Sequence, residues 1–302
     1  MLSVIICTYN RDKYIYYVLE SLAKGTLPPH EYEIVLIDNN CTDNTSAELD
    51  RFAVDWPQVQ LRRFVETHQG LSYARNRGIR EAKGDVLIFL DDDAFPGPDY
   101  LSNIKSVLGS NPHINCFGGE IVPQFEDGQT PEWLCDWNLS WVSGLKMRGG
   151  IREFTKGYPI GANMGFKKAV FKDCGLFNTS LGRSKGNLMG GEEKDIFQRI
   201  ENAGYKIHYI PEIEVRHMIP PSRTTLEYIA RLGQGVGMSE RIRCKALGTP
   251  AYIGRLFSEI VKWGATLFLW LKFFLQGRPA CGNSLMRFRW NVSKTLILDD
   301  NN

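Results

Sequence analysis

The chain has 302 residues, of which 43% are hydrophobic and 23% are charged. This length accommodates one large hydrophobic core, or a core with an appended region, and the composition is ordinary for a globular protein. The net charge of +2 indicates no particular partner, and a nucleic acid partner is not expected. The seven cysteines are scattered without any C-x-x-C pair, which argues against a disulfide framework and against a structural zinc site.

The charge is distributed unevenly along the chain. Residues 1–218 carry 24 Lys and Arg against 29 Asp and Glu, whereas residues 219–302 carry 12 against 5. An acidic body followed by a basic tail indicates that the tail meets something anionic. A strand-like run begins at residue 2, so no signal peptide is expected, and the protein is predicted to work in the reducing cytoplasm.

The first hundred residues alternate between strand-like and helix-like patterns. Short apolar runs predict strands at 2–7, 34–37 and 86–90, residues 60–65 are a candidate for a further strand, and helical patterns predict helices at 15–22, 44–54 and 71–82. This alternation indicates an α/β fold with a mainly parallel, doubly wound sheet. Ligands of such sheets bind at the carboxyl ends of the strands.

The rest of the chain is less regular. The expected features are irregular structure over 96–220, a mobile Gly-, Ser- and Asn-rich loop at 178–191, a helix at 192–203, and helical stretches at 222–247 and 252–276. A Rossmann glycine fingerprint and a phosphate-binding P-loop are both absent from the sequence.

Three adjacent carboxylates, Asp91, Asp92 and Asp93, follow the fourth predicted strand. Their mutual repulsion is unfavourable unless a cation or solvent relieves it. Side chains alternate along a strand, so Asp91 and Asp93 are expected to point one way and Asp92 the other. Mg²⁺ and Mn²⁺ take oxygen ligands and share them with substrate phosphates, so the cluster predicts a metal–diphosphate site. A solvated acidic turn is the alternative.

Six short segments are each common, but their order along the chain is specific. They are SVIICTYNR at 3–11, VLIDNNCTD at 35–43, GLSYARNRGI at 70–79, FLDDDA at 89–94, GANMGF at 161–166 and GGEEKDIFQRI at 190–200. In this order the set closely resembles the family 2 glycosyltransferases of the GT-A fold, over about residues 2–217.

The resemblance implies a GT-A fold, which is a Rossmann-like, doubly wound, mainly parallel sheet, here with a C-terminal helical extension. It implies a catalytic domain at 1–220, divided into a nucleotide-binding half at 1–95 and an acceptor-binding half at 96–220. The helical extension then covers 221–302.

The resemblance also implies roles for residues that bind the nucleotide sugar. Thr8, Asn10 and Asp38 would line the nucleoside pocket, with Asp38 accepting a hydrogen bond from the base, commonly uracil. Strand-end and cap roles are the alternative for Thr8 and Asn10. Arg75 lies on the inward face of its predicted helix and would bind the diphosphate, because a cation there needs an anionic partner. The alternative for Arg75 is a salt bridge to Asp38 or to the aspartate cluster.

The aspartates match the D-x-D motif of the family. Asp93 would be the best metal ligand, Asp92 would contact the ribose or the sugar, and Asp91 belongs to the same nucleotide-sugar site. His217, after a strand-like run, matches a position where some GT-A enzymes place a metal-binding histidine, since neutral imidazole suits Mn²⁺. A structural histidine is the alternative. The expected cofactor is Mn²⁺ or Mg²⁺.

Glu193 matches the position of the general base. A carboxylate there would remove the proton from the acceptor hydroxyl as that oxygen attacks the anomeric carbon, and a single displacement inverts the configuration. Many relatives carry Asp at this position, so Glu193 departs from the pattern and Glu192 is its rival. Acids in the first turn of a helix also favour the helix dipole without any catalytic role.

Two further patterns concern the acceptor and the membrane. Trp133, Trp137 and Trp141 recur at helical spacing after Thr130 and Pro131, so they are predicted to share one helix face, as core, acceptor platform or membrane-facing surface.

The other pattern lies in the tail, where a stripe of large apolar residues over 253–274 is flanked by basic residues. It fits an amphipathic helix at a membrane interface, although packing on the body or a dimer contact would explain it as well. The apolar run at 263–271 is too short to span a bilayer, which takes ~20 residues.

These inferences lead to one leading hypothesis about function. The chain is predicted to be a non-processive, inverting glycosyltransferase that uses a nucleotide diphosphate sugar, with UDP as the default nucleotide and dTDP or GDP as alternatives. The acceptor is a glycan or a lipid-linked molecule in surface polysaccharide synthesis, and contact with the inner face of the cell membrane is a corollary. A sugar-nucleotide pyrophosphorylase, a processive membrane synthase and a non-enzymatic nucleotide-sugar-binding module are the alternatives.

Overall fold

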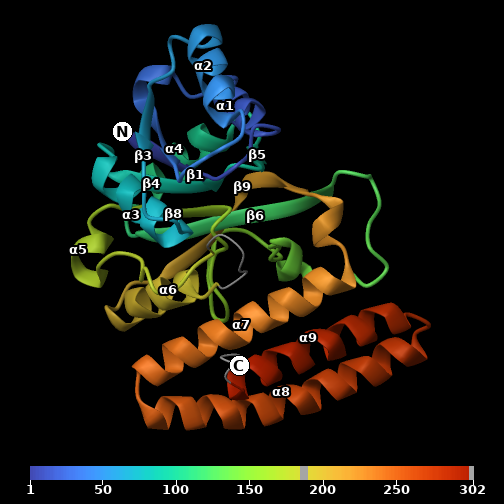
Figure 1. Ribbon diagram of the computed structural model, residues 1–302. Coiled ribbons are helices and arrows are strands. Elements are labelled where there is room, and N and C mark those ends of the chain that lie inside the picture. Colours follow the sequence, from blue (N-terminus) through green and yellow to red (C-terminus); the bar gives the residue numbers. More distant parts are fainter. Residues whose placement is uncertain (184–189, 299–302) are drawn as a thin grey trace. The chain divides into compact units, whose positions relative to one another are not determined.

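Figure 1 shows the computed structural model of the chain, which describes residues 1–183 and 190–298. The chain forms two compact units. The first consists of Met1–Gln124, Ser143–Ser180 and Glu192–Met218, and the second of Phe125–Val142, Leu181–Gly191 and Ile219–Asn302. The second unit therefore includes two segments that precede residue 220. Part of the loop predicted at 178–191, residues 184–189, lies outside the described residues.

The first unit is built on a mixed sheet. Among the described residues its strands are β1 (Leu2–Thr8), β2 (Tyr32–Asp38), β3 (Leu61–Val65), β4 (Val86–Asp91), β5 (Ala94–Pro96), β6 (Cys116–Phe125), β7 (Arg152–Glu153), β8 (Asn163–Lys167) and β9 (Ile207–Ile219). They follow the order β3-β2-β1-β4-β8-β6-β9-β5, with β7 paired to β9. The first four strands of this path are parallel, as predicted, whereas β8, β5 and β7 pair antiparallel to their neighbours.

Helices lie on both faces of the parallel part. They are α1 (Ile15–Ala23), α2 (Thr45–Asp55), α3 (Leu71–Glu81), α4 (Tyr100–Ser110), α5 (Val170–Cys174) and α6 (Glu192–Asn202), with a short 3₁₀ turn η1 (Pro29–Glu31). Side chains along β1 alternate between two cores: Val4 packs with α1 residues on one face, and Ile5 packs with α3 residues on the other. β1, β2 and β4 are buried on both faces and read as continuous apolar runs, which is why the sequence predicts them correctly, whereas β3 is only partly buried.

The register of the parallel strands places their polar ends side by side. Thr8 pairs with Asp38 across β1 and β2, and Cys7 pairs with Asp91 across β1 and β4. The carboxyl ends of β1, β2 and β4 therefore meet at one edge of the sheet, where the sequence predicts the ligand site.

The second unit is helical. It contains η3 (Pro221–Arg223), α7 (Leu226–Ala246), α8 (Thr249–Leu275) and α9 (Pro279–Ile297), together with the 3₁₀ turn η2 (Leu139–Val142). The helix α9 is not among the predicted elements. Gly237 lets α7 approach α9 closely, because a Cβ there would lie 2.4 Å from the Val292 carbonyl oxygen. None of the described helices combines the length and the apolar character needed to cross a membrane.

The predicted helix through the three tryptophans is wrong. Residues 130–138 form turns, and only η2 is helical there. The Asn138 side chain accepts a hydrogen bond from the Cys135 N–H at 2.7 Å and donates one to the Trp133 carbonyl at 2.8 Å. Such a side chain replaces the backbone partners that a helix would supply. Trp133 and Trp141 are buried together in the core of this unit, whereas Trp137 is exposed.

Candidate active site

The loops that follow β1 and β2 are joined by hydrogen bonds at the edge of the sheet. The Asn10 side-chain oxygen accepts the Thr42 N–H at 2.8 Å, and Asp38 Oδ1 accepts the Cys41 N–H at 2.7 Å. Asn10 has a φ of 54°, a left-handed conformation that Asn adopts more readily than most residues. Thr8, Asn10 and Asp38, the three residues predicted to line the nucleoside pocket, therefore lie on two neighbouring strand ends.

A potential metal site lies at the end of β4. One ligand atom from each of Asp91, Asp93 and His217 lies within 4.8 Å of the others. The antiparallel pairing of Ala94 with His217 brings the imidazole next to the aspartates. His217 Nε2 lies 2.9 Å from Asp93 Oδ1 and 4.0 Å from Asp91 Oδ2.

The residues of this cluster fit a divalent cation. Both ring nitrogens of His217 are buried; Nδ1 forms no hydrogen bond with any residue that the structure describes, whereas Nε2 has the Asp93 carboxylate 2.9 Å away. Leaving a buried polar atom without a hydrogen bond is unfavourable, and a metal ion would satisfy it. Two carboxylates and one imidazole suit Mn²⁺, and the carboxylates alone suit Mg²⁺. This geometry is compatible with the predicted role of His217 as a metal ligand.

The middle aspartate has a different environment. Asp92 Oδ1 lies 3.3 Å from Arg11 Nε, and Asp93 Oδ2 lies 3.2 Å from Arg11 Nη2. Burial raises the pKa of Asp92 to about 7; the Arg11 charge opposes this rise and the Asp93 charge adds to it. Arg11 is thus a counter-ion of the cluster that the sequence analysis does not single out. Its position at the end of the first motif, three residues after the end of β1, is the sequence signal that could have identified it.

The predicted diphosphate ligand and the predicted base form one ion-pair cluster. Arg75, buried on α3, lies 2.9 Å from Glu192 and 3.2 Å from Glu193, both in the first turn of α6. Burial lowers the pKa of Arg75, but the two glutamates outweigh it and raise the value well above its usual range. The salt bridge that Arg75 makes is therefore with these glutamates, and not with Asp38 or the aspartates.

Glu193 has a further partner in the chain. Its Oε1 accepts the Gly161 N–H at 2.9 Å, so the GANMGF and GGEEKD segments meet at this carboxylate. Glu192 is buried, whereas the Glu193 side chain is about one-fifth exposed. Of the two glutamates, only Glu193 can be reached readily by an acceptor hydroxyl, as a general base must be.

The sequence was compared with known families and with curated proteins. Residues 3–175, more than half of the chain, match the family described as Glycosyl transferase family 2. The chain is 28% identical over 248 residues to a glucosyl-dolichyl phosphate glucuronosyltransferase of Haloferax volcanii, an alignment that covers 80% of this chain and 76% of that protein. It is 27% identical over 228 residues to the succinoglycan biosynthesis protein ExoM of Rhizobium meliloti, covering 75% and 69%.

Solved structures with the same fold were also found. The mannosyltransferase PcManGT from Pyrobaculum calidifontis, in complex with GDP-Man and Mn²⁺, superimposes with a TM-score of 0.64 at 19% identity, covering 100% of this chain and 88% of that one. TarS of S. aureus, in complex with UDP-GlcNAc, gives a TM-score of 0.57 at 16% identity, covering 97% and 90%. These likenesses show that the fold is that of GT-A glycosyltransferases, as predicted.

Proposed function

This chain belongs to glycosyltransferase family 2, and from that premise we propose that it is an inverting, metal-dependent, non-processive enzyme. It transfers a sugar from a nucleotide diphosphate sugar, with UDP as the default nucleotide, to a glycan or a lipid-linked acceptor. This proposal is supported by the presence of two groups of residues in the first unit. One is the potential metal site of Asp91, Asp93 and His217, and the other is the Glu193 carboxylate, which contacts Arg75 and the Gly161 N–H.

The first group of residues binds the donor. Asp38, at the end of β2, accepts a hydrogen bond from the base, and Thr8 and Asn10 line the same pocket. Asp91, Asp93 and His217 would hold Mn²⁺ or Mg²⁺, and Asp92 would contact the ribose or the sugar. A bound divalent cation supplies positive charge that stabilises the departing diphosphate.

The second group handles the acceptor proton. Glu193 removes the proton from the acceptor hydroxyl as its oxygen attacks the anomeric carbon, and the single displacement inverts the configuration. Arg75 Nη2 lies 3.2 Å from this carboxylate, and the charge of Asp91 also raises the pKa of Arg75. Arg75 is therefore suited to interact with the diphosphate when the donor is present.

The relatives support the choice of acceptor and pathway. One relative is named for its action on glucosyl-dolichyl phosphate, a lipid-linked sugar, and another for succinoglycan biosynthesis. We therefore place this chain in the synthesis of a surface polysaccharide or glycolipid, on the cytoplasmic side of a membrane and in contact with it. Family membership favours this reading over a pyrophosphorylase or a non-enzymatic binding module.

A panel of nucleotides and nucleotide sugars, measured by thermal shift with and without Mn²⁺, tests the donor assignment. A ligand that binds the folded state stabilises it by ~2.7 kcal/mol at 100 times its dissociation constant, so the correct donor should stand out, and only with the metal. NMR of the product from that donor and a soluble acceptor should show the inverted anomer. If no nucleoside diphosphate sugar stabilises the protein, or if the anomeric configuration is retained, the proposal is wrong.

A further inference from the structure

The helix α8 has its polar and apolar faces reversed relative to an ordinary surface helix. Its buried residues include Arg255 and Glu259, which form ion pairs with Glu240 of α7 and Arg289 of α9. Thr266 is buried on the same side. A helix of a globular protein normally turns its apolar stripe inward and its charges toward water.

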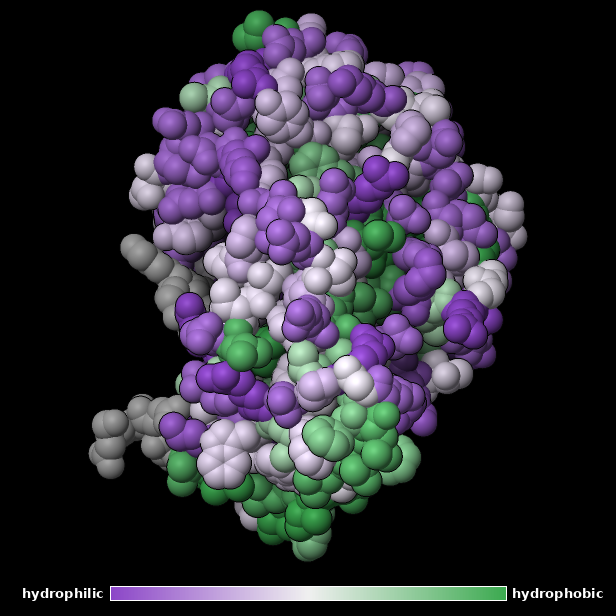
Figure 2. Space-filling model, turned by 90° about the vertical axis from the view of Figure 1, so that its right-hand side faces the viewer, coloured by the Kyte–Doolittle hydropathy of each residue, from purple (hydrophilic) through white to green (hydrophobic). Residues whose placement is uncertain are grey.

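The opposite side of α8 exposes a continuous apolar ridge. The ridge consists of Ile253, Phe257, Ile260, Val261, Leu267, Phe268, Leu271, Phe274 and Leu275, all exposed. These positions repeat every three or four residues, so they share one face about 33 Å long. Figure 2 shows hydrophobic side chains gathered over the helical unit that contains α8 (Figure 1). Exposed apolar surfaces of this extent mark an interaction site.

The exposed charges beside the ridge are positive. The only acidic residue of α8 is the buried, doubly paired Glu259. The side chain of Lys272 forms no hydrogen bond or ion pair with any residue in the described part of the chain. Arg278, in the turn after α8, donates to the Leu134 carbonyl at 3.1 Å and contacts no carboxylate of the described residues. The ridge therefore ends beside two cations that lack an anionic partner.

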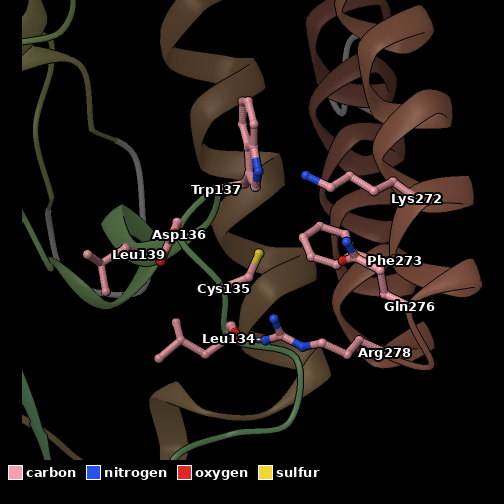
Figure 3. Close-up of a pocket in the computed structure, with 9 residues that line it drawn as sticks. All are labelled: Leu134, Cys135, Asp136, Trp137, Leu139, Lys272, Phe273, Gln276 and Arg278. Carbon is pink, nitrogen blue, oxygen red and sulfur yellow. Dashed lines mark hydrogen bonds between the residues drawn. The ribbon is translucent and has the colours of Figure 1, made fainter.

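A cavity of about 360 Å³ lies between these cations and the segment before η2. Lys272 and Arg278 extend into it from one side, and Cys135, Asp136 and Trp137 line it from the other (Figure 3). Asp136 is its single acidic group. Trp137, which is exposed, gives the cavity an aromatic wall of the kind that is enriched at membrane interfaces.

We propose that the α8 ridge lies in the interface of a membrane, and that the adjoining cavity binds the phosphate group of an anionic lipid through Lys272 and Arg278. The charge complementarity selects a lipid surface as the occupant, since a second copy of the chain would bring the same cations together. The inference deepens the membrane contact contained in the proposed function and rests on it. An amphipathic helix of this kind lies along the surface, with its apolar face among the acyl chains and its cations at the headgroups.

Co-sedimentation of the full chain with vesicles tests this surface. We expect binding to vesicles of phosphatidylcholine with phosphatidylglycerol, weaker binding to phosphatidylcholine alone, and weakening by salt. Lys272→Ala should reduce affinity for the anionic vesicles about fivefold, whereas Lys172→Ala, at an exposed lysine on α5, should not change it. The double variant Phe257→Ser with Phe268→Ser should lose binding at least tenfold, because both rings are exposed in the ridge. Thermal unfolding of each variant shows that it is folded.

Several outcomes would overturn the inference. Wild-type protein that ignores anionic vesicles would show that the ridge does not bind a membrane, and Lys272→Ala that binds them as the wild type does would show that the cavity binds no lipid phosphate. A dimer in sedimentation velocity that the two Phe→Ser changes dissolve, without vesicle binding, would assign the ridge to a contact between copies. Donor binding is measured without vesicles. If no nucleotide sugar binds, the proposed function is contradicted, but the vesicle-binding result is still valid.

Discussion

The guanidinium of Arg75 and the carboxylate of Glu192 form a fully buried ion pair, with Nη1 and Oε1 2.9 Å apart. A buried arginine without a counter-charge is very costly, so Glu192 is needed to keep Arg75 in place. The same guanidinium reaches Glu193, the more exposed of the two glutamates. This arrangement suggests separate tasks for the neighbouring acids, with Glu192 as a positioning residue and Glu193 as the base.

Glu193→Gln should keep donor binding and lose transfer. The amide preserves the shape of the side chain but cannot accept the acceptor's proton, so the rate should fall by ~10²–10⁴-fold. Transfer to a soluble acceptor and calorimetry of the donor, measured on the same preparation, check the two halves of this prediction.

Glu192→Gln is the matched control for that variant. It leaves Arg75 with less counter-charge in a buried place, so we expect a loss of ~1–3 kcal/mol in the free energy of unfolding. The pH dependence of transfer should keep its shape, because the base is unchanged. If Glu192→Gln abolishes transfer while Glu193→Gln remains active, the base has been assigned to the wrong neighbour.

Gly161→Ala should impair transfer while the fold survives. A Cβ at this position would lie 1.9 Å from Arg75 Nη2 and 2.2 Å from Glu193 Oε1, which are the ends of side chains and can move. The substitution should therefore displace both groups and lower the transfer rate with little change in donor affinity. Gly109→Ala, on α4 with no atom within 4 Å of the added Cβ, should be fully active and gain ~0.5–1 kcal/mol of stability. Equal activity of the two variants would argue against a role for this cluster.

Asp93→Ala should remove the metal-dependent part of donor binding. Asp93 contributes a ligand atom to the cluster with Asp91 and His217, and even the loss of a residue that only hydrogen-bonds a metal ligand costs ~10–100-fold in metal affinity. Calorimetry of UDP in the presence of Mn²⁺ should show at least this loss, and chelation of the metal should reproduce it in the wild type. Asp127→Ala, an exposed acid elsewhere, should bind as the wild type does. Unchanged metal-dependent affinity in Asp93→Ala would refute the site.

The buried carboxylate of Glu33 should make stability depend on acid pH. Burial opposes its ionisation, but hydrogen bonds from the Ser3 hydroxyl, the Lys83 N–H and Arg62 hold the pKa of Glu33 below its ordinary value of 4.5. The unfolded chain therefore binds the proton more readily than the folded one. The stabilisation is present above about pH 4.5 and is lost as the pH falls through the folded-state pKa.

Urea unfolding of the wild type and of Glu33→Gln over this range isolates the effect. The difference in unfolding free energy between them should be largest near neutral pH and should shrink in acid, since both side chains are then uncharged. A difference that stays constant with pH would show that the carboxylate contributes by packing alone.

The sequence by itself determined the parallel half of the sheet and the edge where the ligand site lies. Strands β1, β2 and β4 are apolar on both faces, so their residues could be recognised from hydrophobicity alone, and the aspartate cluster begins at the end of β4. The ordered motifs also identified the family, because they depend on the identity of residues and not on their contacts.

Only the tertiary structure decided which charged groups pair with one another. Arg75 meets Glu192 more than a hundred residues later, and His217 reaches Asp93 across the β5–β9 pairing. The local periodicity of a sequence cannot predict such ion pairs, because it indicates the face of a helix or strand on which a residue lies and not which residue of another element packs against that face. For the same reason the stripe on α8 could be recognised in the sequence, but whether it faced a core or solvent depended on the neighbours α7 and α9. Those helices offer Glu240 and Arg289 as partners, so α8 buries Arg255 and Glu259 and exposes most of its large hydrophobic residues, although Lys272 is exposed and Phe273 is buried.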